Sequence, residues 1–131
     1  MPFDFPVGTT GRGRSDRGRT NYHAGKSAED AVARLYEARG VSICRRRWRG
    51  QGGELDLIGR LGDEVIVIEV KQSRTHDLAA SHLSPGQVGR IFAAAEEFVA
   101  TEPKGSLTDL RIDLALVDGQ GRIEVLENAF A

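Results

Sequence analysis

Three charged side chains at the ends of apolar segments are the strongest candidates for chemistry in this sequence: Asp56, Glu69 and Lys71. Glu69 and Lys71 follow the apolar run 65–68, and the two-residue period of a strand places both on one face. Buried charges are costly unless they have partners or a function. The simpler alternative is that the strand emerges into solvent at this point.

Asp56 makes the functional interpretation stronger. It lies between two leucines in the preceding apolar segment, and a tight turn at Gly62 would bring it beside Glu69. Two adjacent carboxylates repel and raise the pKa of at least one of them, unless a cation lies between them. Mg²⁺ or Mn²⁺ would fill this role, and Lys71 would supply a fixed positive charge beside an attacking water or a phosphate. The pattern therefore predicts metal-dependent phosphodiester hydrolysis.

Two further side chains could complete this site. Glu29 borders the apolar stripe of a predicted helix, from which it could reach the metal as a third ligand. The alternative is an acid favoured by the helix dipole, and spacing alone favours that alternative. Gln87, near the start of a second predicted helix, could orient the lysine side of the site from outside the metal ligands.

Basic side chains flank the predicted site. Three arginines and a tryptophan form one run, in which the arginines could bind phosphates while Trp48 stacks on a base. A tryptophan that covers the sheet edge is an equal alternative. Asp113, in a later strand, could support the site from outside the metal ligands, but a solvent-facing acid is the favoured interpretation. The predicted nucleic-acid contacts are Arg46, Arg47, Trp48, Arg49, Arg74 and Arg90.

The elements that must position these residues form an α/β arrangement. A helix at 27–39 precedes three strands, a second helix begins near Pro85, and two more strands follow. The order αβββαββ predicts a central mixed five-stranded sheet flanked by helices. The predicted strands are 41–44, 54–60, 64–71, 110–117 and 122–126, and a polar stretch covers 72–84.

The 131 residues, 40% hydrophobic and 28% charged, suit one compact domain. Residues 1–24 are rich in Gly and Arg without periodicity, so we expect a flexible arm there and the folded domain at 25–131. Residues 1–49 hold 11 Lys/Arg and 5 Asp/Glu, which weakly indicates an anionic partner. The absence of a long apolar run and the single cysteine predict a cytoplasmic protein without a membrane partner.

Several motifs together resemble the YraN-like family of predicted endonucleases. The run Gly-Gly-Glu-Leu-Asp-Leu-Ile around Asp56 is followed by Val-Ile-Glu-Val-Lys, which ends at Lys71. The segment 25–31 is similar to the opening motif of that family, and Arg-Ile-Asp-Leu at 111–114 and Glu-Asn-Ala-Phe at 127–130 are similar to its C-terminal signature. The resemblance covers residues 24–130.

This resemblance implies a PD-(D/E)XK, restriction-endonuclease-like core, related to archaeal Holliday-junction resolvases. By position, Asp56, Glu69 and Lys71 match the acid, acid and lysine of the motif, and Glu29 matches the helix glutamate of the resolvase-like branch. The implied activity is cleavage of DNA, branched or single-stranded, with Mg²⁺ or Mn²⁺. Ser73 stands where the family has an arginine, which thins the positive lining of the site. A nucleic-acid-binding or partner-binding module with little cleavage is therefore the alternative, and a homodimer or a repair or recombination partner would fit either reading.

Overall fold

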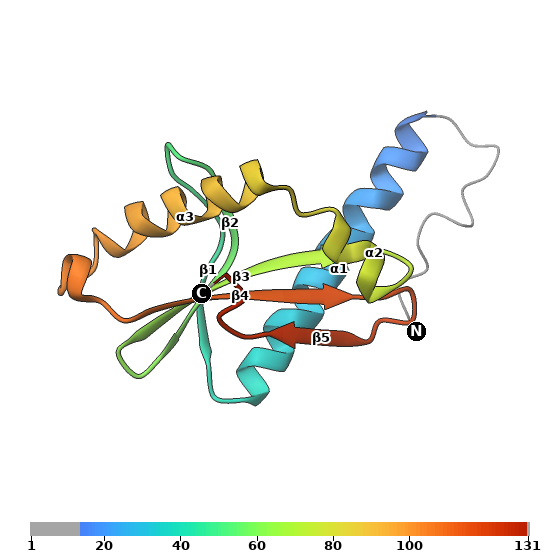
Figure 1. The fold of residues 1–131 in the computed structure, drawn as a ribbon. Coiled ribbons are helices and arrows are strands. Elements are labelled where there is room, and N and C mark those ends of the chain that lie inside the picture. Colours follow the sequence, from blue (N-terminus) through green and yellow to red (C-terminus); the bar gives the residue numbers. More distant parts are fainter. Residues whose placement is uncertain (1–13, 131) are drawn as a thin grey trace.

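The computed structural model describes the backbone of residues 14–130 and the side chains of residues 25–130. Within this range, three helices and five strands follow one another, with a single 3₁₀ turn before the fourth strand (Figure 1). The elements are α1 (Arg14–Ala38), β1 (Ser42–Arg49), β2 (Glu54–Leu61), β3 (Glu64–Gln72), α2 (His76–Ser81), α3 (Pro85–Val99), η2 (Gly105–Leu107), β4 (Leu110–Val117) and β5 (Ile123–Leu126).

The five strands form one mixed sheet in the order β1-β2-β3-β4-β5. The pairs β1–β2, β2–β3 and β4–β5 are antiparallel, whereas β3 and β4 run parallel. The parallel pair needs a long crossover, and α2 and α3 supply it. The predicted α/β fold with a central mixed five-stranded sheet is therefore confirmed.

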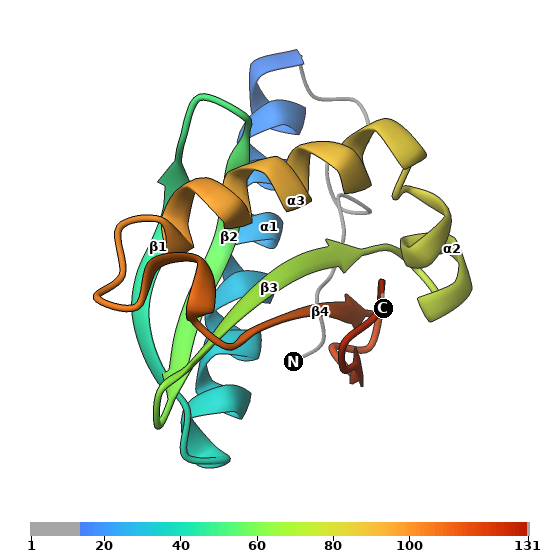
Figure 2. The ribbon, with the colours of Figure 1, turned by 60° about the vertical axis from the view of Figure 1, so that its left-hand side comes forward.

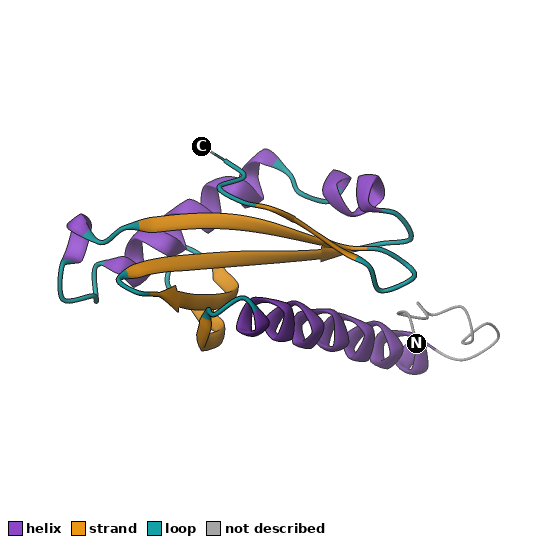
Figure 3. Ribbon diagram, turned by 90° about the horizontal axis from the view of Figure 1, so that it is seen from below, coloured by secondary structure: helices purple, strands orange, loops and turns teal. Residues whose placement is uncertain are grey.

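The sheet lies between two helices. α1 packs on one face, where Val32 and Tyr36 contact a cluster that includes Ile66 and Ile68 of β3, and it forms a layer of its own below the strands (Figure 3). α3 packs on the opposite face against Val65 and Val67 (Figure 2). Both faces of β3 are covered, which explains why its residues 65–68 are an unbroken run of Val and Ile. No helix of the described part combines the length and apolar character needed to cross a bilayer.

A tight turn joins β2 to β3, as the sequence predicts. Leu61 pairs with Glu64, so only Gly62 and Asp63 form the connection. Gly62 has a φ of +61°, in the left-handed region that two-residue hairpin turns require and that glycine adopts without strain. This turn sets the register of the strand pair, which places Asp56 of β2 opposite Glu69 of β3.

The helical content exceeds the prediction in two places. α1 begins at Arg14, well before the predicted start at residue 27, so residues 14–24 continue the helix. The prediction relied on apolar periodicity, which residues 14–24 lack, so that pattern did not indicate this extension of the helix. The predicted polar stretch contains α2, whose N-terminus is capped by Thr75. Residues 1–13 of the predicted arm lie outside the described residues.

The expectation that Asp113 faces solvent is wrong. Its side chain is fully buried on the α1 face of β4. Its carboxylate accepts hydrogen bonds from the Tyr36 hydroxyl (2.7 Å), from Arg111 Nε (2.9 Å) and from the Asn128 amide (3.0 Å). A buried carboxylate persists only when its lone pairs are satisfied, and here its partners connect α1, β4 and the C-terminal turn.

Candidate active site

The candidate site lies where β2 and β3 separate. Their regular pairing ends at Leu57 and Ile68. Asp56, the next residue of β2, directs its carboxylate at the β3 backbone, and its Oδ2 accepts a hydrogen bond from the Val70 amide (2.8 Å). We call this point the fork. The strands part here, so a carboxylate takes the place that a strand carbonyl would have in a continuous ladder.

Glu69 and Lys71 enter the fork from β3. Glu69 is 4% exposed, and its Oε2 lies 3.3 Å from Lys71 Nζ. The strand period that places Val65 and Val67 under α3 continues to these two residues, so the alternation argument for them is confirmed. The structure therefore gives a buried acid a cation as its neighbour.

α3 adds a second partner for the buried acid. Gln87 Nε2 donates a hydrogen bond to Glu69 Oε2 (3.3 Å). The helix start fixes this glutamine, because Ser84 caps the helix by accepting from the Gln87 amide (3.1 Å) and Pro85 occupies the first turn. Gln87 thus contacts Glu69. The prediction placed Gln87 beside Lys71, but among the described residues these two side chains are linked only through the Glu69 carboxylate.

The electrostatics of the fork favour a proton on Glu69. Burial, and then the neighbouring charge of Asp56, raise the pKa of Glu69 to about 8, although Lys71 opposes this. Burial also raises the pKa of Asp56, while its hydrogen bond from Val70 lowers it. The predicted repulsion between the two carboxylates is present, but desolvation is the larger effect, which strand alternation alone does not show.

Glu29 approaches the fork from α1 but has another partner. Its two carboxylate oxygens lie 3.2 Å and 3.3 Å from Nε and Nη2 of Arg47, a two-bond arrangement. Burial and then the charge of Asp56 raise the pKa of Glu29, while Arg47 lowers it. The structure therefore brings Glu29 within electrostatic reach of Asp56, with an arginine holding its oxygens.

Two of the other predicted basic residues pair with acids of the same chain. Arg46 forms an ion pair with Asp30 (2.6 Å), and Arg49 forms one with Glu54 (3.1 Å). Trp48 packs edge-on against Phe98 of α3, with ring centroids 5.4 Å apart, which favours the packing alternative for this residue. Arg74 and Arg90 are exposed, the first just after β3 and the second on α3.

One residue that the sequence analysis missed organises the start of β2. Glu97 of α3 accepts hydrogen bonds from the Gln51 amide (2.9 Å) and the Gly52 amide (2.5 Å), and these bonds lower the pKa of Glu97. The approach is close, since a Cβ at Gly52 would meet Glu97 Oε1 at 3.0 Å. The Gly-Gln-Gly-Gly run at 50–53 was the available signal, because it indicates a backbone that something approaches closely.

The donor set at the fork suits a metal that the substrate helps to bind. Among the described residues, no group of three or more His, Cys, Asp or Glu side chains is arranged to hold an ion. Mg²⁺, however, is commonly held by one or two carboxylates, with water and phosphate oxygens completing its shell. Asp56 and Glu69 provide two carboxylates, and burial is the main reason why the pKa values of both are raised.

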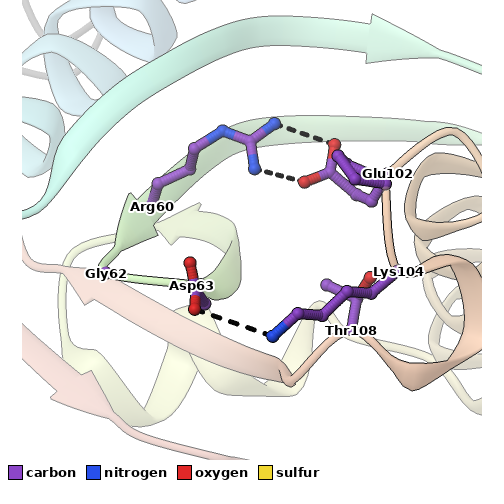
Figure 4. A pocket seen from close by; sticks show the side chains of 7 residues that line it. Arg60, Gly62, Asp63, Glu102, Lys104 and Thr108 are labelled. Atoms are coloured by element: carbon purple, nitrogen blue, oxygen red, sulfur yellow. Dashed lines mark hydrogen bonds and ion pairs between the residues drawn. The ribbon is translucent and has the colours of Figure 1, made fainter.

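A hollow at the other end of β2 has a different character. It has a volume of about 150 Å³ and is lined by Arg60, Asp63, Glu102 and Lys104, among others (Figure 4). Arg60 forms two hydrogen bonds with Glu102, and Lys104 lies 3.7 Å from Asp63. Each cation here faces an acid, so the hollow offers no net positive charge to a phosphate.

Comparison with known proteins places the chain among close relatives. The model of the uncharacterised protein family UPF0102 matches residues 28–117. A UPF0102 protein of Cereibacter sphaeroides strain KD131 is 57% identical over 114 residues, which is 87% of this chain and 97% of the relative. One of Ruegeria pomeroyi is 56% identical over 116 residues, covering 88% and 94% of the two chains. One of Dinoroseobacter shibae is 43% identical over 117 residues, covering 89% and 87%.

Proposed function

The chain belongs to the uncharacterised protein family UPF0102, and we propose that it is a metal-dependent endonuclease that hydrolyses phosphodiester bonds of branched or single-stranded DNA. One observation carries the proposal: the Asp56 carboxylate, the buried Glu69 carboxylate and the Lys71 ammonium converge where β2 leaves β3. A cytoplasmic location, as expected from the sequence, is part of the same proposal.

In this proposal Asp56 and Glu69 would hold Mg²⁺ or Mn²⁺. When bound, the ion would act as a Lewis acid toward the scissile phosphate and lower the pKa of a bound water. Gln87 donates to Glu69 Oε2 and would help to keep this acid oriented when a metal binds. Glu69 must release its proton to become a ligand, and Lys71 beside it favours the ionised form.

Lys71 has a second task in this proposal. Its ammonium lies 3.3 Å from Glu69, and its side chain is 18% exposed, so it is held in place while part of it stays accessible. A fixed cation in a partly desolvated site stabilises the negative charge that develops on the phosphate and can orient the attacking water. The Val70 amide holds Asp56, which keeps this acid aligned before substrate arrives.

Cleavage of a panel of DNA substrates tests the proposal. Duplex, single-stranded, flap and four-way DNA are incubated with Mg²⁺ and with Mn²⁺, and we expect cutting of at least one of them. Asp56→Asn should abolish it. Asp63→Asn is the matched control, because Asp63 is an exposed acid at the far end of the same strand pair. No cutting with either metal, or equal cutting by both variants, would contradict an endonuclease centred on the fork.

A nucleic-acid-binding module with little cleavage is the second candidate. Arg46, Arg47 and Arg49 pair with acids of the same chain, which leaves less positive charge for a phosphate backbone, so we expect the DNA affinity of such a module to be weak. Fluorescence anisotropy separates the two, since a module of this kind would bind DNA and leave it intact with both metals. If the chain binds no DNA, a partner-binding role becomes the better explanation. The partner would be a second copy of the chain or another protein of a repair or recombination complex.

A further inference from the structure

Arg47 has an unusual backbone for its position. Its φ is +50°, in the left-handed region that side chains other than glycine rarely adopt, although it lies inside β1. Regular pairing with β2 includes Arg46 with Leu57 and Trp48 with Leu55, which places Arg47 opposite Asp56. Backbone strain of this kind persists where the surroundings impose it, and it is frequent at functional sites.

The strained backbone has a direct consequence for the side chains. Successive residues of a regular strand point to opposite faces. Here, however, Arg46 and Arg47 both reach α1, where they contact the neighbouring acids Asp30 and Glu29. The irregular backbone at Arg47 thus directs a second guanidinium to Glu29, the acid of α1 whose pKa is raised by burial and by the charge of Asp56.

The partner of Arg47 is the acid that the metal site would need as a third ligand. Glu29 is only 15% exposed, whereas the Arg47 side chain is 46% exposed and reachable from solvent. A guanidinium that makes two parallel bonds to a carboxylate can make the same two bonds to a phosphate. Arg47 therefore binds Glu29, a carboxylate that the metal could use as a ligand. A phosphate of the substrate could take the place of this carboxylate on the guanidinium.

We propose that Arg47 is an exchangeable latch: in the free protein it holds Glu29, and when a nucleic-acid strand binds it transfers to a phosphate and releases Glu29 to join Asp56 and Glu69 at the metal. This inference rests on the proposed function and adds regulation to it. Because coupling between two ligands is reciprocal, a bound strand should tighten metal binding and bound metal should tighten strand binding. The protein would then complete its metal site only in the presence of substrate.

Mn²⁺ binding, measured by calorimetry or from the spin-resonance signal of the free ion, tests the latch without any cleavage. Arg47→Gln should tighten Mn²⁺ binding about fivefold or more without DNA, because Glu29 is released, a coupling typical of linked sites. Arg46→Gln is the matched control: it removes the same charge from a side chain that is also 46% exposed and pairs with the adjacent acid. Its effect should stay within about twofold, the size of a screened long-range charge effect.

A second arm tests the exchange itself. A cleavage-resistant phosphorothioate strand, with its own Mn²⁺ binding subtracted, should tighten Mn²⁺ binding to the wild type and to Arg46→Gln. It should have little effect on Arg47→Gln, whose Glu29 is already free. Glu29→Gln should lose the strand effect as well. If Arg47→Gln does not fold, Arg47→Gly serves in its place, because glycine adopts a φ of +50° without strain.

The outcomes separate the latch from the proposed function. Equal effects of the two arginine variants, weaker Mn²⁺ binding in Arg47→Gln, or a strand effect that persists in that variant would each overturn the latch. In those cases a loss of Mn²⁺ binding in Asp56→Asn would still support the fork as the metal site. A wild type that binds no Mn²⁺, or an Asp56→Asn variant that binds it equally well, would overturn both.

Discussion

The raised pKa of Glu69 predicts that the free energy of unfolding depends on pH. In the metal-free protein burial and the charge of Asp56 raise this pKa to about 8, from its ordinary value of 4.5. Below the lower value, both the folded and the unfolded chain carry the proton. As the pH rises from 4.5 to 8, the unfolded chain loses it while the folded chain keeps it, so the free energy of unfolding falls. Above 8 both forms are ionised, and the cost stays constant.

The size of the effect follows from the proton count. One proton bound only in the folded state changes the free energy of unfolding by about 1.4 kcal/mol per pH unit. Between pH 5 and pH 7 the Glu69 contribution should therefore fall by about 3 kcal/mol. The side chain is 5% exposed, so solvent screens little of this. Glu69→Gln keeps the shape and the hydrogen-bonding capacity of the protonated acid, but has no proton to lose.

Urea unfolding of wild type and Glu69→Gln at pH 5 and pH 7, both with a chelator, measures the difference. Ionisable groups outside the fork contribute equally to the two proteins, and the hydrogen-bonding capacity of Gln resembles that of the protonated acid beside Asp56. We therefore expect the variant to gain about 3 kcal/mol on the wild type between these pH values. Added Mg²⁺ should reduce this gain, because it stabilises the ionised wild-type site.

Glu97→Gln is the control for this prediction. The Gly52 and Gln51 amides lower the pKa of Glu97, so its contribution is present above the usual carboxyl pKa and is lost as the pH falls. This variant should show no gain on the wild type between pH 5 and pH 7. A Glu69→Gln difference that is independent of pH, or that shrinks toward pH 7, would refute the protonated Glu69 and the electrostatic description of the fork.

Three further substitutions have outcomes that the structure specifies. Asp56→Asn keeps an oxygen for the Val70 amide, so metal-free stability in thermal melts should be unchanged or slightly higher, while Mg²⁺-induced stabilisation disappears; a clear metal-free loss would point to a structural Asp56. Asp113→Ala should cost about 3–5 kcal/mol in urea unfolding, because it leaves the buried Tyr36 hydroxyl without its acceptor and removes the nearest carboxylate of Arg111; a cost below about 1 kcal/mol, the level of an ordinary exposed ion pair, would contradict the buried cluster. Gly59→Ala places a Cβ 2.5 Å from a Val41 methyl carbon and should destabilise by about 1–3 kcal/mol, with an unchanged melting temperature as the contrary result.

The sequence by itself determined the sheet and the register of the β2–β3 hairpin. The run of Val and Ile at 65–68 can only be covered on both faces, and a two-residue turn at Gly62 leaves one way to pair the flanking strands. Because strand alternation is geometric, that pairing also predicted that Asp56, Glu69 and Lys71 would meet. Local patterns of this kind can be obtained from residue order alone.

Tertiary structure decided how these residues interact. Asp56 bonds to the Val70 amide because β2 pairs with β3 only from Leu57 onward. Leu55 and Leu57 pack in different clusters, which simple alternation does not foresee. Asp113 is buried because Tyr36, far away in sequence, supplies a donor. Arg47 holds Glu29 because its backbone leaves the regular strand conformation. Each outcome depends on a partner distant in the chain, and the desolvation and hydrogen bonding that set a pKa or select an ion pair arise only when folding brings such partners into contact.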